Sequence, residues 1–438
     1  MANNTSVFQL PEFVGYTARF HQRANTLRHY RLYYSGKIYD DSAFKLAHKL
    51  YAQTKALLSF LARAVDLDVA LVPGVMEPWA LADGTPDAVV QAQQTLYEWS
   101  SWDTEGDEWL EDGATCGEAM IKIVPDAEAK QIQMQRLRPE LCLLTDHLDP
   151  ATQTTVQLAL IVDRSLTDAE GKEYEYAEAI TPTEIRTYWN GQPHGYHGNP
   201  DRYENPLGFV PVVRAKNDSD CRPTFAKALP QVDSVNELAS YLANVIGRHV
   251  EPQWAAMGAE QADLKKDGSN VWFFPNADAK LEAILADIDI EGTLAFVKEL
   301  KEETKANLPE LAFDDLRAKD QIAAETLEIQ LIELDAKIWK MRRRYDAALV
   351  DAHKMAALAA TTYGIGELAT LLAPHSFDYK RPVRPVSELE QIRLAEARLN
   401  LALLETATSA EGMTALTTPG GAGAVPELET AAAADTTV

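Results

Sequence analysis

Cysteine is scarce in this chain of 438 residues, which contains only Cys116, Cys142 and Cys221. These form no Cys-x-x-Cys pair, which suits a reducing compartment and argues against a disulfide framework or a structural zinc site. The chain also lacks any run of eighteen apolar residues, so we expect no segment that spans a membrane. Its first residues lack the basic and apolar regions of a secretory signal, so we expect none there.

Catalytic signatures are absent as well. The sequence contains no GxxxxGK[ST], no GxGxxG after a strand, no GxSxG and no HExxH. His194 and His197 lie in a stretch rich in Gly, Pro and Asn, which indicates a surface turn. We therefore expect no enzyme, no cofactor and no metal. A metal-dependent enzyme stays an alternative, because paired acids occur at Asp66/Asp68, Asp287/Asp289 and Asp314/Asp315.

Positive charge is in short supply, since 41 Lys and Arg residues face 66 Asp and Glu residues and the formal net charge is −25. A protein that grips nucleic acid nonspecifically needs a basic face to neutralise phosphates. Most of this surface should therefore repel DNA. The basic and aromatic residues 13–40 are the exception. We interpret them as a surface arm with some core aromatics, and contact with nucleic acid or an acidic neighbour is the alternative.

What the sequence does contain is one long amphipathic stretch. Residues 321–363 include no Pro or Gly. Apolar residues recur there at spacings of three and four, which predicts a helix with one apolar stripe: Leu327, Leu331, Leu334, Ile338, Met341, Tyr345, Ala348, Ala352 and Met355. At 1.5 Å per residue this helix would run about 60 Å. Such a helix must bury its stripe along a neighbouring element or subunit.

The rest of the chain reads as a mixture of helices and strands. Helices are predicted over residues 42–65, 87–99, 106–117, 232–250, 291–307 and 387–406. Strands are predicted over residues 68–72, 119–124, 132–137, 141–145, 156–162, 173–180, 185–189 and 271–274. Asn190-Gly191 is a hairpin signal, and Pro230 is expected to break the segment before the next helix. From about residue 412 the chain is rich in Ala, Thr, Gly and Pro, which predicts disorder. The fold class is α+β.

One local motif and the order of these elements point to a family. Residues 204–217 read ENPLGFVPVVRAKN. They resemble the NPLG-x-VPVV-x-x-x-N strand that precedes the first stem helix in many portal proteins of tailed bacteriophages, of the SPP1/HK97-like type. The resemblance covers about residues 30–405 as an order of elements. The short crown segment and the Ala/Thr-rich tail depart from the pattern and leave the crown boundary open.

The resemblance implies a portal fold with the following parts. They are an N-terminal arm (1–29), an α+β wing (30–225), a stem helix (226–251), a small α/β clip (252–290), a second stem helix (291–307), a tunnel loop (308–320), a long wing helix (321–365), a short helical crown (366–410) and a disordered tail (411–438).

The function implied by the resemblance is that of a ring, of about twelve subunits, at one capsid vertex of a virion assembled in the host cytoplasm. The genome would be packaged and ejected through it. The partners would be other copies of the chain, the terminase large subunit, a head-completion or adaptor protein, the major capsid and scaffolding proteins, and double-stranded DNA that passes through the channel without sequence specificity. The alternative is a non-viral helical scaffold or adaptor that uses the long helix as a coiled-coil seam and forms a dimer or trimer.

Site residues follow from these assignments as hypotheses. A channel that passes DNA must not hold it, and acidic charge limits sticking because it repels phosphates. Residues expected in the tunnel loop at the channel are Leu311, Phe313, Asp314, Asp315, Arg317 and Lys319. Residues expected on the channel side of the second stem helix are Lys298, Lys301 and Lys305. Residues expected to dock the terminase or an adaptor at the clip are Lys265, Lys266, Trp272 and Phe273.

Overall fold

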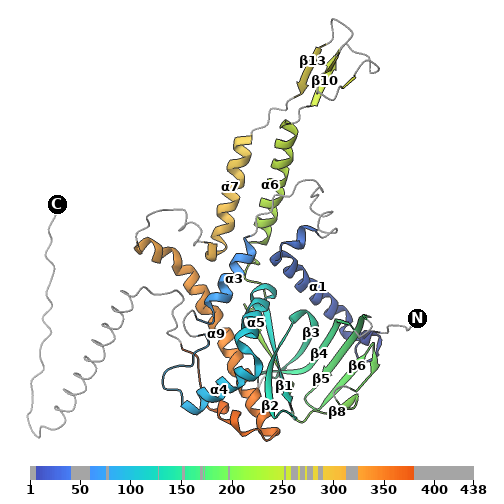
Figure 1. Ribbon diagram of the computed structural model, residues 1–438, viewed down its shortest axis with the longest axis vertical. Coiled ribbons are helices and arrows are strands. Elements are labelled where there is room, and N and C mark those ends of the chain that lie inside the picture. The colour runs from blue at the N-terminus through green and yellow to red at the C-terminus, as the bar shows by residue number, and fades with distance from the viewer. Residues whose placement is uncertain are drawn as a thin grey trace, which may run out of the picture. The chain divides into compact units, whose positions relative to one another are not determined.

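Helices, two larger antiparallel sheets and two short two-stranded pairs make up the part of the chain that the computed structural model describes (Figure 1). This part comprises residues 6–40, 60–74, 78–126, 128–149, 153–167, 171, 173–195, 198–250, 253–257, 265–266, 272–273, 280–284, 290–311 and 324–378. The predicted helix over residues 387–406 and the predicted tail lie outside it. The mixture of elements confirms the predicted α+β class.

The α-helices are α1 (Thr17–Tyr34), α3 (Leu61–Leu71), α4 (Asp87–Ser100), α5 (Trp102–Cys116), α6 (Leu229–Val250), α7 (Ile290–Ala306) and α9 (Ala324–Thr362). Short 3-10 helices are η1 (Val7–Gln9), η2 (Val14–Tyr16), η3 (Lys37–Asp40), η4 (Pro139–Leu141), η6 (Pro309–Leu311) and η7 (Gly366–Leu372). Among the described residues, no helix is both long enough and apolar enough to cross a bilayer.

The first sheet has the strand order β2-β1-β9, from β1 (Glu118–Asp126), β2 (Gln131–Leu137) and β9 (Val212–Lys216). The second has the order β3-β4-β5-β6-β7, with β8 paired to β6. Its strands are β3 (Cys142–Asp149), β4 (Gln153–Thr167), β5 (Glu173–Ile180), β6 (Glu184–Trp189), β7 (Gln192–Pro193) and β8 (Arg202–Glu204). Asn190 and Gly191 form the two-residue turn between β6 and β7, both at positive φ, which confirms the predicted hairpin.

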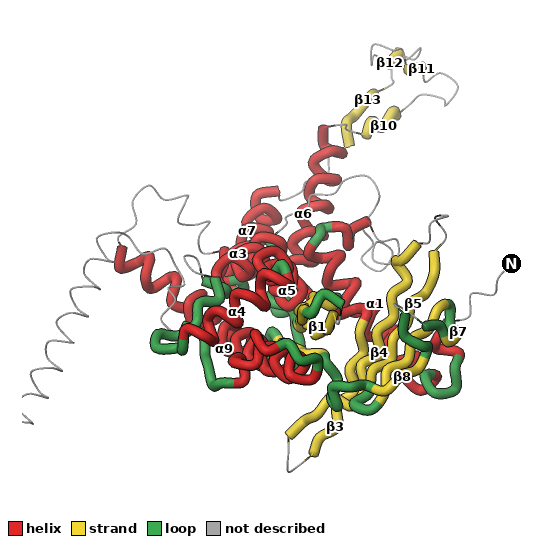
Figure 2. Tube along the Cα trace, turned by 60° about the horizontal axis from the view of Figure 1, so that its bottom comes forward, coloured by secondary structure: helices red, strands yellow, loops and turns green. Residues whose placement is uncertain are grey.

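Strand β1 joins two hydrophobic layers because its side chains alternate between the faces of the sheet. Ile121 and Ile123 pack against the core that α4, α5 and α9 cover. Met120 points the other way, into a core shared with β3, β4 and β5. On the far face of the second sheet lie the N-terminal residues and α1, whose buried Phe8 and Phe20 complete a third core. The layers are therefore helices, sheet, sheet and N-terminal segment (Figure 2).

Helix α9 confirms the predicted long amphipathic helix, from Ala324 to Thr362. Its stripe is buried within the chain, against the first sheet and α5, at Leu331, Leu334, Ile338, Met341, Tyr345, Ala348 and Ala352. Burial at spacings of three and four is what an amphipathic helix on a sheet requires. Over this span the stripe is not available as a seam for a coiled coil.

Two local predictions were wrong. Residues 68–72, predicted as a strand, continue α3 to Leu71, and Val72 caps it. Leu61, Val65 and Asp68 lie on one buried helical face, so tertiary packing overrides the β propensity of this short apolar run. Pro230 does not break the chain but lies in the first turn of α6, where a missing N–H removes no intrahelical hydrogen bond.

Candidate functional site

Helices α6 and α7 lie side by side (Figure 1). The segment between them contains two short antiparallel pairs. Strand β10 (Gln253–Met257) pairs with β13 (Lys280–Ile284), and β11 (Lys265–Lys266) pairs with β12 (Trp272–Phe273). Antiparallel pairing of β10 with β13 brings the end of α6 and the start of α7 together. This helix pair and its strands form the candidate site for channel and docking functions.

The four residues predicted to dock a partner meet on facing strands. Lys265 pairs with Phe273, and Lys266 pairs with Trp272. The backbone therefore brings each predicted lysine beside a predicted aromatic residue, at the position that Figure 2 labels β11 and β12.

The lysines predicted to face a channel differ in their surroundings along α7. Lys298 is exposed, whereas Lys301 is half-buried. The ammonium of Lys301 lies 5.9 Å from the ring centroid of Phe60, within the range of a cation–π interaction. Lys305 is on the same helix, and its side chain lies outside the described part. Leu294 and Phe296 are 43% and 50% exposed, so α7 presents apolar as well as charged surface.

Only the first residues of the predicted tunnel loop are described. Leu308 and Leu311 are buried in a core with Leu61 and Val65 of α3. Leu311, predicted at the channel, is therefore a packing residue at the base of this segment. The other predicted tunnel residues lie outside the described part of the chain: Phe313, Asp314, Asp315, Arg317 and Lys319.

A buried charge cluster includes Glu310, which lies among the described first residues of the predicted tunnel loop. Glu310 of η6 is fully buried and forms an ion pair with Lys337 of α9. The Lys337 ammonium is also 3.2 Å from a carboxylate oxygen of Asp68 on α3. That same Asp68 oxygen accepts a 2.5 Å hydrogen bond from the Thr224 hydroxyl. Burial and the Asp68 carboxylate raise the pKa of Glu310 to about 7, although Lys337 opposes the rise. The cluster ties η6 to α3 and α9.

Helix α6 is held by a different kind of contact. Tyr33 donates a 2.6 Å hydrogen bond to Asp233 of α6, and Tyr39 donates one of 3.2 Å to the other oxygen of the same carboxylate. The side-chain amide of Asn236 donates to the Tyr39 hydroxyl at 2.6 Å. Burial raises the pKa of both tyrosines well above their usual value. These hydrogen bonds therefore persist through the neutral pH range.

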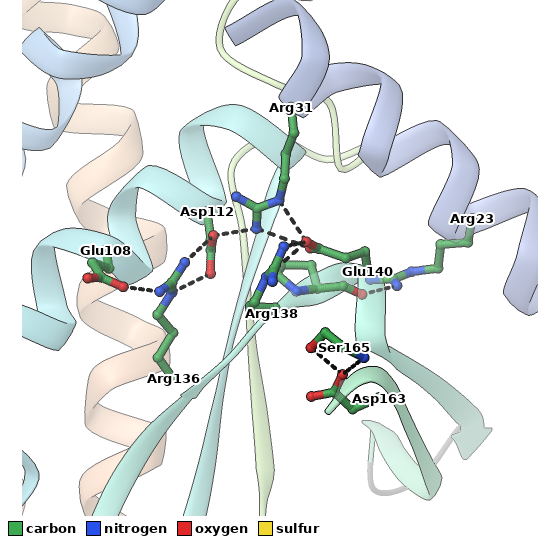
Figure 3. Close-up of polar contacts among 10 residues, drawn as sticks. Arg23, Arg31, Glu108, Asp112, Arg136, Arg138, Glu140, Asp163 and Ser165 are labelled. Carbon is green, nitrogen blue, oxygen red and sulfur yellow. Dashed lines mark hydrogen bonds and ion pairs between the residues drawn. The ribbon is translucent and has the colours of Figure 1, made fainter. Parts of the chain in front are cut away.

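A larger ion network fixes α1 to the helical layer (Figure 3). Arg31 of α1 lies 2.6 Å from Asp112 of α5 and 2.8 Å from Glu140 of η4. Arg136 of β2 holds the same Asp112 at 2.7 Å and also contacts Glu108. Asp112 is completely buried, so this carboxylate is the common acceptor of two guanidinium groups. Burial would raise the pKa of Glu140, but Arg31 holds it below its usual value.

Of the paired acids considered as a metal site, the structure describes Asp66 and Asp68. These two carboxylates do not share one environment. Asp66 is exposed and accepts a hydrogen bond from Tyr34, whereas Asp68 is buried beside Lys337. Two residues apart on a helix, they point to different faces. Within the described residues, no group of three or more His, Cys, Asp and Glu side chains could hold a metal ion. Asp287, Asp289, Asp314, Asp315 and His197 lie outside them.

Sequence reasoning missed the residues that anchor the helix pair. Asp68 and Glu310 are acids set inside short apolar runs, LDVALV and LPELAF, and a charge in such a run is a signal of a buried partner. Lys337 lies beside the apolar stripe of the long helix. The sequence pattern indicates that Asp68, Glu310 and Lys337 each need a counter-charge, but it does not indicate that the three side chains meet.

A family model described as "Phage portal protein, SPP1 Gp6-like" matches residues 16–396. A search of curated proteins finds no match. Among solved structures, a chain from "Virion of native gene transfer agent (GTA) particle" is 13% identical, with coverage of 79% of this chain and 85% of that chain and a TM-score of 0.39. A chain from "Neck of empty GTA particle computed with C6 symmetry" is 12% identical, with coverage of 67% and 77% and a TM-score of 0.37.

Proposed function

The chain belongs to the phage portal protein family of the SPP1 Gp6-like type, and from this membership we propose that it forms the ring-shaped DNA channel at one vertex of a virus capsid. The genome enters and leaves through this ring in the virion. The observation that carries the proposal is the family match, which spans residues 16–396. The family is a structural one, in line with the prediction that the chain is not an enzyme.

The described elements fit the parts of such a ring. We assign α6 and α7 to the stem, the strands between them to the clip, residues 308–320 to the tunnel loop, and α9 to the long wing helix. The wing comprises the two sheets with α3, α4 and α5. Helix α1 runs unbroken through residue 30, so the arm ends before α1 in this assignment. Residues 366–410 are assigned to the crown.

Charge supports a channel that passes DNA without holding it. The net charge of −25 makes most of the surface repulsive to phosphates, while Lys298 on α7 is an exposed positive group. A ring repeats such a lysine once per subunit. The lysines then attract the DNA backbone weakly and without sequence preference. In this proposal, Arg317 and Lys319 of the tunnel loop also attract the DNA backbone weakly and without sequence preference.

The partners follow from the place of the ring in the virion. The strand pair with Lys265, Lys266, Trp272 and Phe273 combines positive charge with aromatic side chains, a combination enriched at protein interfaces. We assign it to docking of the terminase large subunit during packaging and of a head-completion or adaptor protein afterwards. The capsid and scaffolding proteins contact the remaining outer surface.

Particle size tests the proposal directly. Purified full-length chain should form closed rings of about twelve subunits, seen by negative-stain electron microscopy and weighed by light scattering. A ring contradicts the scaffold alternative, whose long helix would give a dimer or trimer. A stable dimer as the largest species would contradict the portal assignment.

Two charge-reversal variants, compared in one packaging assay, distinguish the role of the tunnel loop in DNA passage from the role of the clip in terminase docking. Arg317→Glu with Lys319→Glu should lower DNA uptake about tenfold without changing terminase binding, because the change repels phosphates inside the channel. Lys265→Glu with Lys266→Glu should weaken terminase binding about tenfold and lower uptake only through that loss. Both variants must still form rings. Wild-type uptake by the first variant would show that its side chains do not face DNA.

A further inference from the structure

The joint between α7 and the rest of the chain is built around Glu310. Helix α7 ends at Ala306, and η6 begins three residues later at Pro309. Leu308 and Leu311 bury η6 against α3, and Glu310 between them reaches Lys337 on α9. Whatever holds Glu310 therefore holds the end of α7.

The charges in this joint do not balance. Asp68 and Glu310 supply two carboxyl groups, and Lys337 supplies one ammonium. Both carboxyl groups are buried, with 1% and 0% of the residue exposed. One oxygen of each, Oδ1 of Asp68 and Oε2 of Glu310, has no hydrogen-bond partner among the described residues. Two buried carboxylates on one ammonium repel each other, and a proton on the free oxygen of Glu310 removes that repulsion.

Helix α6 is anchored by hydrogen bonds from two phenols. Its Asp233 accepts hydrogen bonds from Tyr33 and Tyr39, and neither phenol loses its proton near neutral pH. The two helices of the pair thus meet the rest of the chain through joints of different chemistry. In the described part of the chain, the joint of α7 contains a carboxyl group, that of Glu310, whose pKa lies near neutrality.

We propose that Asp68, Lys337 and Glu310 form a proton-dependent joint that positions α7, and that the joint loosens when Glu310 loses its proton. Glu310 and Lys337 are positioning residues in this proposal, since they act through η6 on the helix. The consequence for a stem rests on the proposed portal function, whereas the joint itself is a property of the single chain.

Three elements pack against η6, and their charged groups set the direction of the effect. Helix α3 contributes Asp68, which favours the protonated form of Glu310, and α9 contributes Lys337, which favours the ionised form. Helix α7 carries Lys301, Glu302, Glu303 and Lys305 in its last turns. Because the pKa of Glu310 in the folded chain, about 7, exceeds its ordinary value of about 4.3, the closed joint binds the proton more tightly than the open one. The stability that the Glu310 proton gives to the closed joint is therefore fully present below about pH 4.3, and it is lost as pH rises through 7.

Hydrogen exchange of the full-length chain tests this inference without any DNA. Exchange is measured at about pH 6 and about pH 8.5, with correction for the intrinsic chemical rate. In the wild type, amide protection in residues 300–311 should fall about tenfold from the lower to the higher pH. In Glu310→Gln, which keeps the shape and cannot ionise, protection should be the same at both. The first turns of α6 serve as the internal reference and should show no change.

Matched variants on α9 complete the design. Lys337→Met should lower protection of residues 300–311 at both pH values, while Lys340→Met, an exposed lysine three residues away, should behave as the wild type. Should Lys337→Met fail to fold, the comparison of wild type with Glu310→Gln decides alone. An equal pH response in those two proteins overturns the inference, as does a pH-independent wild type. Failure of the chain to form rings or package DNA would instead count against the portal function.

Discussion

Asp112→Ala should lower the free energy of unfolding by about 4 kcal/mol, the largest loss we expect from one substitution in this chain. Asp112 is completely buried on α5. Its two oxygens accept hydrogen bonds from Arg31 at 2.6 Å and from Arg136 at 2.7 and 3.0 Å. Alanine removes the shared acceptor and leaves two guanidinium groups close together with less negative charge between them.

The loss should fall on the attachment of α1, since Arg31 is one of the side chains that hold this helix to the helical layer. Arg31 keeps its ion pair with Glu140, and Arg136 keeps its contact with Glu108, so the chain should still fold at low temperature. Chemical denaturation followed by circular dichroism measures the change in free energy. Faster proteolysis within α1 should accompany it.

Asp107→Ala is the matched control for that prediction. Asp107 is exposed on the same helix, and partial desolvation together with the neighbouring Asp103 raises its pKa. Removing a repelled surface carboxylate should change stability by less than about 0.5 kcal/mol. Equal losses for the two alanine variants would mean that the network in Figure 3 does not stabilise the fold.

Arg342→Met should cost about 3 kcal/mol, the second largest loss. Arg342 lies on α9 with 1% of its surface exposed. Its guanidinium donates hydrogen bonds to the carbonyl oxygens of Leu71 at 2.7 Å and Val72 at 3.0 Å. These carbonyls end α3, so the arginine satisfies acceptors that a helix terminus leaves without intrahelical partners. It also lies over the ring of Trp339.

Methionine fills most of the volume but donates no hydrogen bond, so the loss comes from the two carbonyls rather than from a cavity. Arg343→Met is the control, because Arg343 is the next residue on the same helix and is exposed. Thermal unfolding of the two variants side by side gives the comparison. If Arg342→Met unfolds at the same temperature as its neighbour's variant, the end of α3 does not depend on this contact.

Local patterns in the sequence were sufficient for some of the regular elements. The spacing of apolar residues predicted α9, and its buried positions from Leu331 to Ala352 are those of the predicted stripe. The Asn190-Gly191 turn and the β-prone runs on either side of it predicted the hairpin. Periodicity and turn chemistry act within a few residues, so a sequence reports them directly.

Short apolar runs were ambiguous for the same reason. Residues 68–72 have the composition of a strand, yet they complete α3 because Asp68 faces Lys337 and Leu71 faces the core. A run of five residues does not distinguish a strand from a buried helical turn. The neighbours decide, and Lys337, which pairs with Asp68, is more than 250 positions away in the chain.

The sequence by itself determined the class of this protein, the long helix with its apolar stripe, and the strand motif whose resemblance to portal proteins agrees with the family match. Only the tertiary structure decided which charges meet: Asp112 with Arg31 and Arg136, and Glu310 with Lys337 and Asp68. Periodicity reports the face of an element that must leave water. The partner of a buried charge depends on how distant elements pack, because a charge inside the protein is stable only beside its counter-charge.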